Sequence, residues 1–258
     1  MLRLRTIDAN TLARFIFLPK LYTESWILNS FTANIEMKII SFNINLFNQQ
    51  KIDSILQYDA DIYIIPEIAC SSRVTLPEGY HMEWTGDIPH KGLGVIWKSS
   101  VKVEIPTWFN PEHRYFLPLM VENKLIIAAW PTTTKHNSPM KYPEIAMKAF
   151  QEYAPYIKQF PTIITGDMNC YKGQSGETKQ YSIQAICDFL RNMNLISAYH
   201  DVTGETLGNE RCATYYHQFK ETQPFFIDYT FSCIPLKSYH LGEWDKDLSD
   251  HVPQIIEI

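Results

Sequence analysis

Residues 161–169, PTIITGDMN, hold the pattern that decides the fold: a short apolar run that ends in an aspartate and an asparagine. Residues 38–43, KIISFN, repeat this arrangement and also finish on an asparagine. Short apolar runs with polar ends are typical of strands that are buried on both faces. In both places a helical segment follows, and then a second apolar run, DIYII at 61–65 and FFIDYTF at 225–231. Two such βα halves with antiparallel hairpins predict an α/β fold in which two sheets stack with helices outside.

Outward from these runs, strand and helix patterns alternate. Asn48–Tyr58, Glu144–Ile157 and Tyr181–Met193 place apolar residues at helical spacing, and Asn48 suits the N-cap of the first of them. We expect Pro66 to close the strand DIYII. Further strands are expected at Tyr80–Trp84, Leu93–Trp97, Val101–Ile105, Tyr115–Val121, Lys124–Trp130, Ala213–Tyr216, Phe226–Cys233 and Gln254–Ile258.

The composition limits the class of protein. The chain has 258 residues, of which 45% are hydrophobic and 14% aromatic, so it can bury a core and is not dominated by disorder. A net charge of −5 argues against coating of nucleic acid through bulk positive charge, although it leaves a local basic patch open. Five scattered cysteines without a CxxC pair indicate reduced thiols in a cytoplasmic protein. No run reaches the roughly 18 apolar residues that a membrane span needs.

The first 36 residues differ from the rest of the chain. They carry loose apolar clusters without a sustained strand or helix period, whereas Met37 opens a much cleaner pattern. We therefore expect residues 1–36 to be an N-terminal extension of unknown role. No linker or low-complexity segment interrupts residues 37–258, which are expected to form one domain.

Polar residues that suit metal binding or catalysis stand at or near the ends of the predicted strands. They are Asn43, Glu67, Asp167, Asn169, Asp228, Asp250 and His251. One aspartate in such a place is typically a cap or a turn residue, but this many carboxylates and carboxamides at one sheet edge indicate a site. Their hard oxygen atoms suit Mg²⁺ or Mn²⁺. A divalent ion would relieve the repulsion between the carboxylates, and a loose, solvated arrangement is the structural alternative.

Two spacings in this set predict side-chain directions. If the strand continues through Asp167 and Asn169, both side chains point to the same face. Asp250 and His251 are adjacent, so an extended backbone would send them in different directions. One of them could then face a cation and the other a substrate.

The motifs MKIISFNIN, a glutamate after an apolar strand, GDMN, IDYTF and SDHVP occur in this order. Together they resemble the endonuclease/exonuclease/phosphatase superfamily, which includes exonuclease III, the abasic-site endonucleases and deoxyribonuclease I. The likeness covers about residues 37–258. It implies a DNase I-like four-layer α/β sandwich, with two packed mixed sheets flanked by helices, and Mg²⁺-dependent hydrolysis of phosphoesters. It also implies that Glu67 is the principal metal ligand and that Asn43 and Asp250 complete the metal site directly or through water.

The resemblance implies catalytic roles for four further residues. His251 would contact the scissile phosphate or activate the attacking water, and Asp228 would hold the His251 ring in orientation. Asp167 would bind or polarise that water, and Asn169 would donate a hydrogen bond to the phosphate. Which of Asp167 and His251 is the general base stays open.

One position departs from the family pattern. After the strand LIIAAWP, the nuclease branch carries a phosphate-contacting tyrosine two residues before the proline, and phosphatase-like branches carry a histidine in this strand; here the position is Ala129. The neighbouring Trp130 and the loop residues His136 and Lys141 are candidates for the missing substrate contact. Tyr216 and Phe225, near Asp228 in sequence, are candidates for stacking on a base or sugar, with plain strand packing as the alternative.

The leading hypothesis is a metal-dependent nuclease that acts on DNA as a monomer. The motif series favours it, including the segment SPMKYPEIAMKAFQEY before GDMN. The alternative is a phosphatase or phosphodiesterase for a small nucleotide or a lipid headgroup, which the acidic composition and Ala129 favour. A catalytically inactive binding module is disfavoured because all seven motif residues are present.

Overall fold

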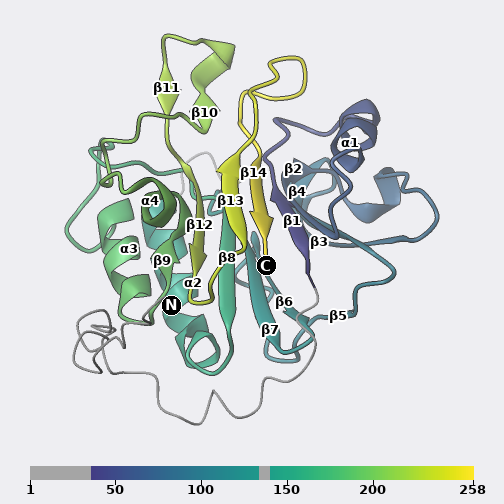
Figure 1. Cartoon of the computed structure of the whole chain (residues 1–258), viewed down its shortest axis with the longest axis horizontal. Coiled ribbons are helices and arrows are strands. Elements are labelled where there is room, and N and C mark those ends of the chain that lie inside the picture. Colours follow the sequence, from purple (N-terminus) through teal and green to yellow (C-terminus); the bar gives the residue numbers. More distant parts are fainter. Residues whose placement is uncertain (1–35, 134–139) are drawn as a thin grey trace, which may run out of the picture. The chain divides into compact units, whose positions relative to one another are not determined.

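Two mixed sheets of six strands each organise the described part of the chain, residues 36–133 and 140–258, in this computed structural model (Figure 1). Apart from Glu36, the expected N-terminal extension lies outside the described residues, and so does His136. Helices lie on the outer faces of the two sheets, so the predicted four-layer sandwich is confirmed. None of the described helices is both long and apolar enough to span a bilayer.

The first sheet contains the strands predicted from KIISFN and DIYII. Its order is β13 (Ser238–Leu241), β14 (Gln254–Glu257), β1 (Lys38–Ser41), β2 (Ile62–Ile68), β4 (Lys91–Lys98) and β3 (Tyr80–Ile88). Only the β1–β2 pair is parallel. Helix α1 (Gln49–Leu56) connects β1 to β2, and the Asn48 side chain caps it by accepting from the Gln50 N–H, as the sequence predicts.

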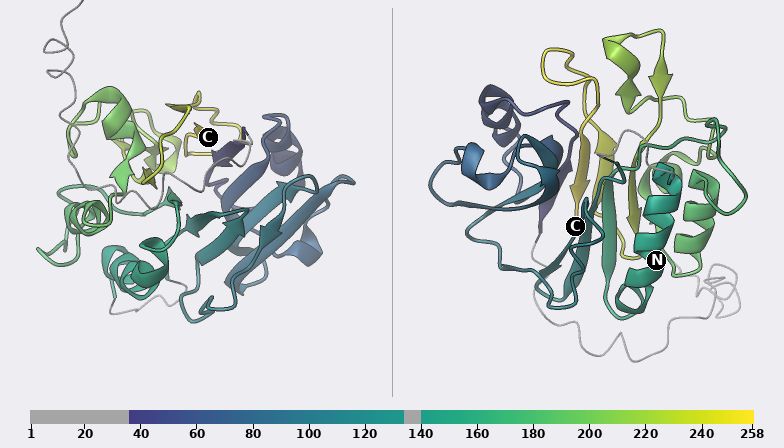
Figure 2. Two further views of the ribbon diagram at one scale, coloured as in Figure 1. Left: turned by 60° about the horizontal axis from the view of Figure 1, so that its bottom comes forward. Right: turned by 180° about the vertical axis from the view of Figure 1, so that it is seen from behind.

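The second sheet holds the strand of PTIITGDMN near its centre. Its order is β5 (Val103–Glu104), β6 (Phe116–Val121), β7 (Lys124–Ala129), β8 (Thr162–Asp167), β12 (Asp228–Ser232) and β9 (Ile196–Ser197). Only β7 and β8 are parallel. Helices α2 (Tyr142–Ile157) and α3 (Ile183–Arg191) lie side by side outside this sheet (Figure 2), and α4 (Ala198–Thr203) packs on β12. A small ribbon of β10 (Tyr215–Tyr216) and β11 (Pro224–Phe225) projects beyond the sheets.

Burial on both faces explains why the central strands read as continuous apolar runs. In β1, Ile39 belongs to the core between the two sheets, whereas its neighbour Ile40 packs with Ile52 and Ile55 of α1. All four side chains are fully buried. Successive residues of a strand point to opposite faces, so both positions must be apolar here.

Several predicted strand boundaries differ from the structure, and two of them have a clear physical cause. β2 does not stop at Pro66 but continues to Ile68, because the Pro66 carbonyl still accepts from the Ile44 N–H and Pro66 pairs with Leu93 of β4. The strand predicted from Phe226 begins only at Asp228. The N–H groups of residues 227 and 228 both donate to the hydroxyl of Thr214, which takes the backbone out of the ladder before that point.

Candidate active site

Strand ends from both sheets meet at one edge and carry six of the predicted residues. Asn43 follows β1, Glu67 lies in β2, and Asp167 ends β8. β12 runs antiparallel to β8, so its first residue, Asp228, lies directly opposite Asp167 in the register. The turn before β14 adds Asp250 and His251. The chain thus brings together groups that are up to about 200 residues apart.

Gly166 makes the approach of Asp167 possible. Its φ of +151° lies in a region that favours glycine, and a Cβ at this position would lie 1.8 Å from the Ala129 carbonyl oxygen of β7. No other residue fits between β7 and β8 at this point. The glycine of the GDMN motif therefore serves the close packing of the strand that carries the aspartate.

A buried histidine lies between three carboxylates. His251 Nδ1 donates to Asp228 Oδ2 at 2.9 Å, and its Nε2 lies 3.9 Å from both Asp167 Oδ2 and Asp250 Oδ1. Burial by itself would lower the pKa of His251, but the charges of Asp228, Asp167 and Asp250 outweigh it and raise that pKa to about 9. The ring of Tyr215 lies 4.6 Å from the His251 ring and covers it from the side of β10.

Asn43 links the carboxylates that the two sheets contribute. Its Nδ2 donates to Asp167 Oδ2 at 2.9 Å and lies 3.4 Å from Glu67 Oε1. Glu67 has a φ of +66° at an irregularity between Pro66 and Ile68. A non-glycine residue at positive φ is uncommon and clusters at functional sites, so the backbone of β2 is bent where it presents this carboxylate.

Negative charge is crowded at this edge. Burial, and then the nearby Asp228, raises the pKa of Asp167 to about 7, and burial also raises the pKa of Asp250. Asp250 and His251 do not point apart as expected, since their side-chain ends lie 3.9 Å from each other. An isolated antiparallel bridge between Tyr215 and His251 ties the backbone at this point to β10.

This donor set fits a hard divalent cation. Glu67, Asp250 and Asn43 offer carboxylate and amide oxygens, which are the ligands that a hard divalent cation prefers. Asp167, Asp228 and His251 also offer ligand atoms within 4.8 Å of one another. In that second group His251 and Asp228 already satisfy each other through the 2.9 Å hydrogen bond. The more exposed side of the cluster, at Glu67 and Asp250, is therefore the better place for a metal.

Asp167 and Asn169 would point to the same face only if the strand continued through both residues, and it does not. β8 ends at Asp167, and Asn169 lies beyond it in the left-handed region, with φ of +51°. Its backbone N–H donates to Asp167 Oδ1 at 2.8 Å, while its side-chain amide donates to the Pro131 carbonyl at 3.2 Å. Asn169 therefore reaches the cluster by its backbone, and its amide lies next to the end of β7.

Two of the candidate substrate contacts, Trp130 and Lys141, lie in different environments. Trp130 is only 2% exposed, which leaves its ring no open face for a substrate and corrects the expectation. It is buried because it continues β7 into the core and packs edge-to-face on Tyr115. Lys141 is exposed at the N-cap of α2, with its stem near Gly176, and within the described ranges no cluster residue contacts it.

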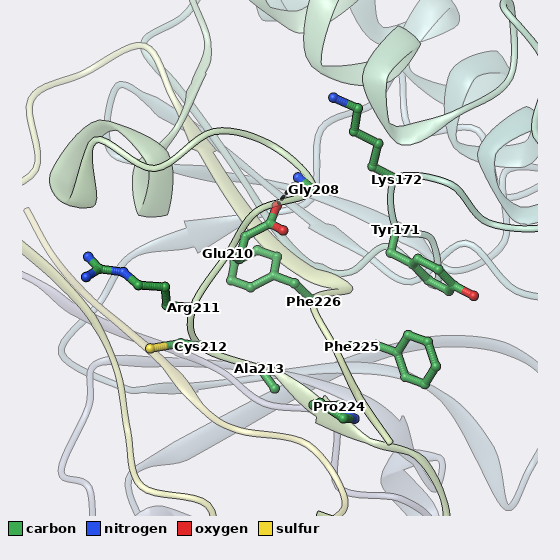
Figure 3. A pocket seen from close by; sticks show the side chains of 10 residues that line it. All are labelled: Tyr171, Lys172, Gly208, Glu210, Arg211, Cys212, Ala213, Pro224, Phe225 and Phe226. Atoms are coloured by element: carbon green, nitrogen blue, oxygen red, sulfur yellow. Dashed lines mark hydrogen bonds between the residues drawn. The ribbon is translucent and has the colours of Figure 1, made fainter. Parts of the chain in front are cut away.

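Tyr216 and Phe225 belong to the β10–β11 ribbon next to the cluster. The Tyr216 N–H donates to the Asp250 carbonyl, but its ring stacks on Trp244 at 3.9 Å. The Phe225 ring lies 4.8 Å from that of Tyr171, at the side of a pocket of about 200 Å³ (Figure 3). Glu210, Arg211 and Cys212 line other parts of this pocket, which contains none of the clustered polar residues.

Sequence reasoning missed several residues that contact the cluster, and Lys91 and Ser249 are among them. Lys91 of β4 forms an ion pair with Glu67, with 3.0 Å between Nζ and Oε2. Ser249 donates to the Asn43 carbonyl at 2.6 Å and accepts from the His251 N–H, so it ties two segments of the site together. Ser249 belongs to the SDHVP motif, so the sequence carried a signal for it. No local pattern distinguishes Lys91 from any other strand lysine.

Solved structures provide the comparison, since no family model and no curated relative matches the sequence. An AP endonuclease from Archaeoglobus fulgidus matches with a TM-score of 0.63 and 16% identity, over 85% of this chain and 98% of its own. This chain has the DNase I-like fold. A 3′-5′ exonuclease (NExo) from Neisseria meningitidis matches this DNase I-like chain with a TM-score of 0.58 and 18% identity, over 86% and 99% of the two chains. The endonuclease domain of TRAS1, a telomere-specific non-LTR retrotransposon, matches with a TM-score of 0.59 and 13% identity, over 87% of this chain and 98% of its own.

Proposed function

We propose that this protein is a divalent-metal-dependent phosphodiester hydrolase that acts on DNA. The observation that carries the proposal is the convergence of four carboxylates, an asparagine and a hydrogen-bonded histidine at one edge of two DNase I-like sheets. Hydrolysis at phosphorus needs a cation for the developing charge, an oriented water and fixed donors. This edge supplies candidates for each of these functions.

Glu67, Asp250 and Asn43 would hold the cation, for which we propose Mg²⁺ or Mn²⁺. When bound there, it would supply Lewis-acid stabilisation of the charge on the phosphate oxygens. The bent backbone at Glu67 and the bonds between Ser249 and the Asn43 segment keep these oxygens at the edge. The protein therefore offers hard ligands that are already positioned before the cation arrives.

Asp167 and His251 would act on the water and the phosphate. The Asp167 carboxylate is fixed by the Asn43 amide and the Asn169 N–H, so it can accept a hydrogen bond from an attacking water in one orientation. Asp228 holds Nδ1 of His251 and leaves Nε2 directed between Asp167 and Asp250. Nε2 can then donate to a phosphate oxygen at the same edge. Asn169 is placed beside the cluster to contribute a donor once its bond to Pro131 exchanges.

DNA is the preferred substrate because structurally similar proteins are described as an AP endonuclease, a 3′-5′ exonuclease and a 3′ phosphatase bound to a product DNA hairpin. The aromatic β10–β11 ribbon beside His251 supports a nucleic acid, since rings there can stack on bases. A small nucleotide or a lipid-headgroup phosphate is the alternative, favoured by Ala129, which offers no hydroxyl at the end of β7. We further propose that the protein works as a cytoplasmic monomer, and its five free thiols support a reducing compartment.

The experiment is one incubation series with plasmid, linear, abasic and single-stranded DNA, RNA and a chromogenic phosphodiester, each with Mg²⁺, Mn²⁺ or EDTA. We expect DNA cleavage that requires the metal. Glu67→Gln should weaken Mn²⁺ binding, measured by calorimetry, by about tenfold or more because a charged ligand is lost. Glu104→Gln, an exposed carboxylate of β5, is the matched control and should change neither quantity. Cleavage that persists in EDTA, or Mn²⁺ affinity unaffected by Glu67→Gln, would refute the proposal.

A further inference from the structure

We propose that Lys91 is a positioning residue that exchanges partners: its ammonium group holds Glu67 in the metal-free protein and binds a DNA phosphate once Glu67 ligates the cation. This inference rests on the proposed function. It assigns a second, cationic contact to the substrate beside the carboxylate cluster. Nothing in the sequence motifs points to this lysine.

The first observation is the ion pair itself. Lys91 Nζ lies 3.0 Å from Glu67 Oε2, while the other oxygen of Glu67 faces the Asn43 amide. The metal ligand that we propose is thus held on both sides. An ammonium group at this distance and a divalent cation on the same carboxylate repel each other, so the two compete for Glu67.

The second observation is the surface on which the ammonium group rests. Lys91 Nζ lies 5.4 Å from the centre of the Trp130 ring, which is buried and packs edge-to-face on Tyr115. A cation over an aromatic face is attracted to it without using up a hydrogen bond. The ring therefore keeps the ammonium group at the rim of the site while its anionic partner changes.

The third observation is that Lys91 can reach a substrate. Its side chain is 33% exposed, compared with 16% for Glu67, so Lys91 is the more solvent-accessible partner of the ion pair. When Glu67 ligates the cation, Lys91 loses its carboxylate partner. The anionic oxygens of an approaching phosphate can then take the place of that carboxylate. Ala129 and the buried Trp130 offer no open contact from the end of β7, which leaves a cationic contact from β4 to fill this side.

A purely structural lysine would behave differently. Lys98, at the other end of β4, pairs with Asp59 at 2.6 Å and with Asp61, and none of these partners is a cluster residue. β4 has eight residues, and these two lysines are its first and last, so their Cα atoms are roughly 23 Å apart. Lys98→Met is therefore a matched control for loss of one ammonium group from the same strand.

The test compares Lys91→Met, which keeps length but loses charge, with Lys91→Arg and Lys98→Met. Calorimetry measures Mn²⁺ binding to each protein alone, and steady-state cleavage of a labelled duplex gives kcat/KM as a function of salt. Lys91→Met should bind Mn²⁺ about 3–10-fold more tightly, because a competing charge is gone. Its kcat/KM should fall about 10-fold, chiefly through KM, and the salt slope should drop by about 0.9, as for one lost phosphate contact. Lys91→Arg should restore most of kcat/KM.

The opposite results are equally distinct. Mn²⁺ affinity that stays within twofold of wild type in a folded Lys91→Met overturns the inference, as does tighter Mn²⁺ binding with an unchanged salt slope. Equal effects of Lys98→Met would also overturn it, since they would show a general charge effect. A wild-type chain that neither binds Mn²⁺ nor cleaves any phosphodiester refutes the proposed function as well, whereas normal wild-type behaviour confines the failure to Lys91.

Discussion

The Asp228→Asn substitution tests how much the His251–Asp228 hydrogen bond contributes to catalysis. The two groups are buried, and their Nδ1 and Oδ2 atoms are 2.9 Å apart. Opposite unit charges at about 4 Å attract each other by about 4 kcal/mol at an effective dielectric constant near 20. An asparagine keeps the shape but not the charge, and its amide can present an N–H to a ring nitrogen that should itself donate. We expect a loss of about 3–4 kcal/mol of transition-state stabilisation, or roughly 10²–10³-fold in kcat.

The same substitution has a small effect on folding. Asp228 is one of the charges that raise the pKa of Asp167, so its removal relieves repulsion while it weakens the bond to His251. The two effects oppose each other, and the free energy of unfolding should change by less than about 2 kcal/mol. The backbone bond from Asp228 to Thr214 is unaffected by the change of side chain.

The assay is kcat for cleavage of a labelled duplex with Mg²⁺, together with thermal unfolding followed by circular dichroism. Glu152→Gln is the matched control: Glu152 pairs with His113, yet among the described residues it contacts none of the cluster. A kcat within tenfold of wild type in Asp228→Asn would refute the orienting role. So would a similar loss in Glu152→Gln, because the effect would then not be specific to this pair.

Two further predictions concern ionisation. Asp167→Asn should abolish measurable cleavage, yet stabilise the metal-free protein at pH 8 by roughly 1–3 kcal/mol, because a carboxyl whose pKa is raised from 3.8 to about 7 costs stability as the pH rises through that range. Denaturant unfolding in EDTA measures this change in the free energy of unfolding, and a destabilised Asp167→Asn protein would contradict the reasoning. Glu205 accepts from the Arg211 N–H, the Tyr199 hydroxyl and the Arg211 side chain, which together lower its pKa from 4.5 to about 2. Its contribution is therefore present above pH 4.5 and lost as the pH falls toward 2, so an NMR titration that places Glu205 near 4.5 would show that these bonds do not form in solution.

The strands at the centre of the fold were predictable because their environment leaves one choice. Residues such as Ile39 and Ile40 face two different apolar layers, so the sequence must be apolar at every position. The N-cap at Asn48 was predictable because the Asn48 side chain satisfies the N–H of Gln50, two residues on. The N-cap depends on a neighbour in sequence, and the apolar strands depend on surroundings that are apolar on both faces.

The boundaries were less predictable where a distant group decides them. Pro66 stays within β2 because Ile44, in the segment after β1, and Leu93 of β4 still pair with it. The start of β12 depends on a hydroxyl 14 residues away, at Thr214. Neither partner leaves a trace in the local periodicity from which strands are predicted.

The sequence by itself determined the fold class and the identities of the polar residues at the strand ends, because the order of strand types and the motifs are local properties. Only the tertiary structure decided how those residues face one another: Asp250 turns toward His251, Asn169 turns away, Trp130 is buried, and Lys91 reaches Glu67. Side-chain direction at a sheet edge depends on the backbone bend and on the packing of segments far apart in the chain. Those quantities exist only once the two sheets have come together.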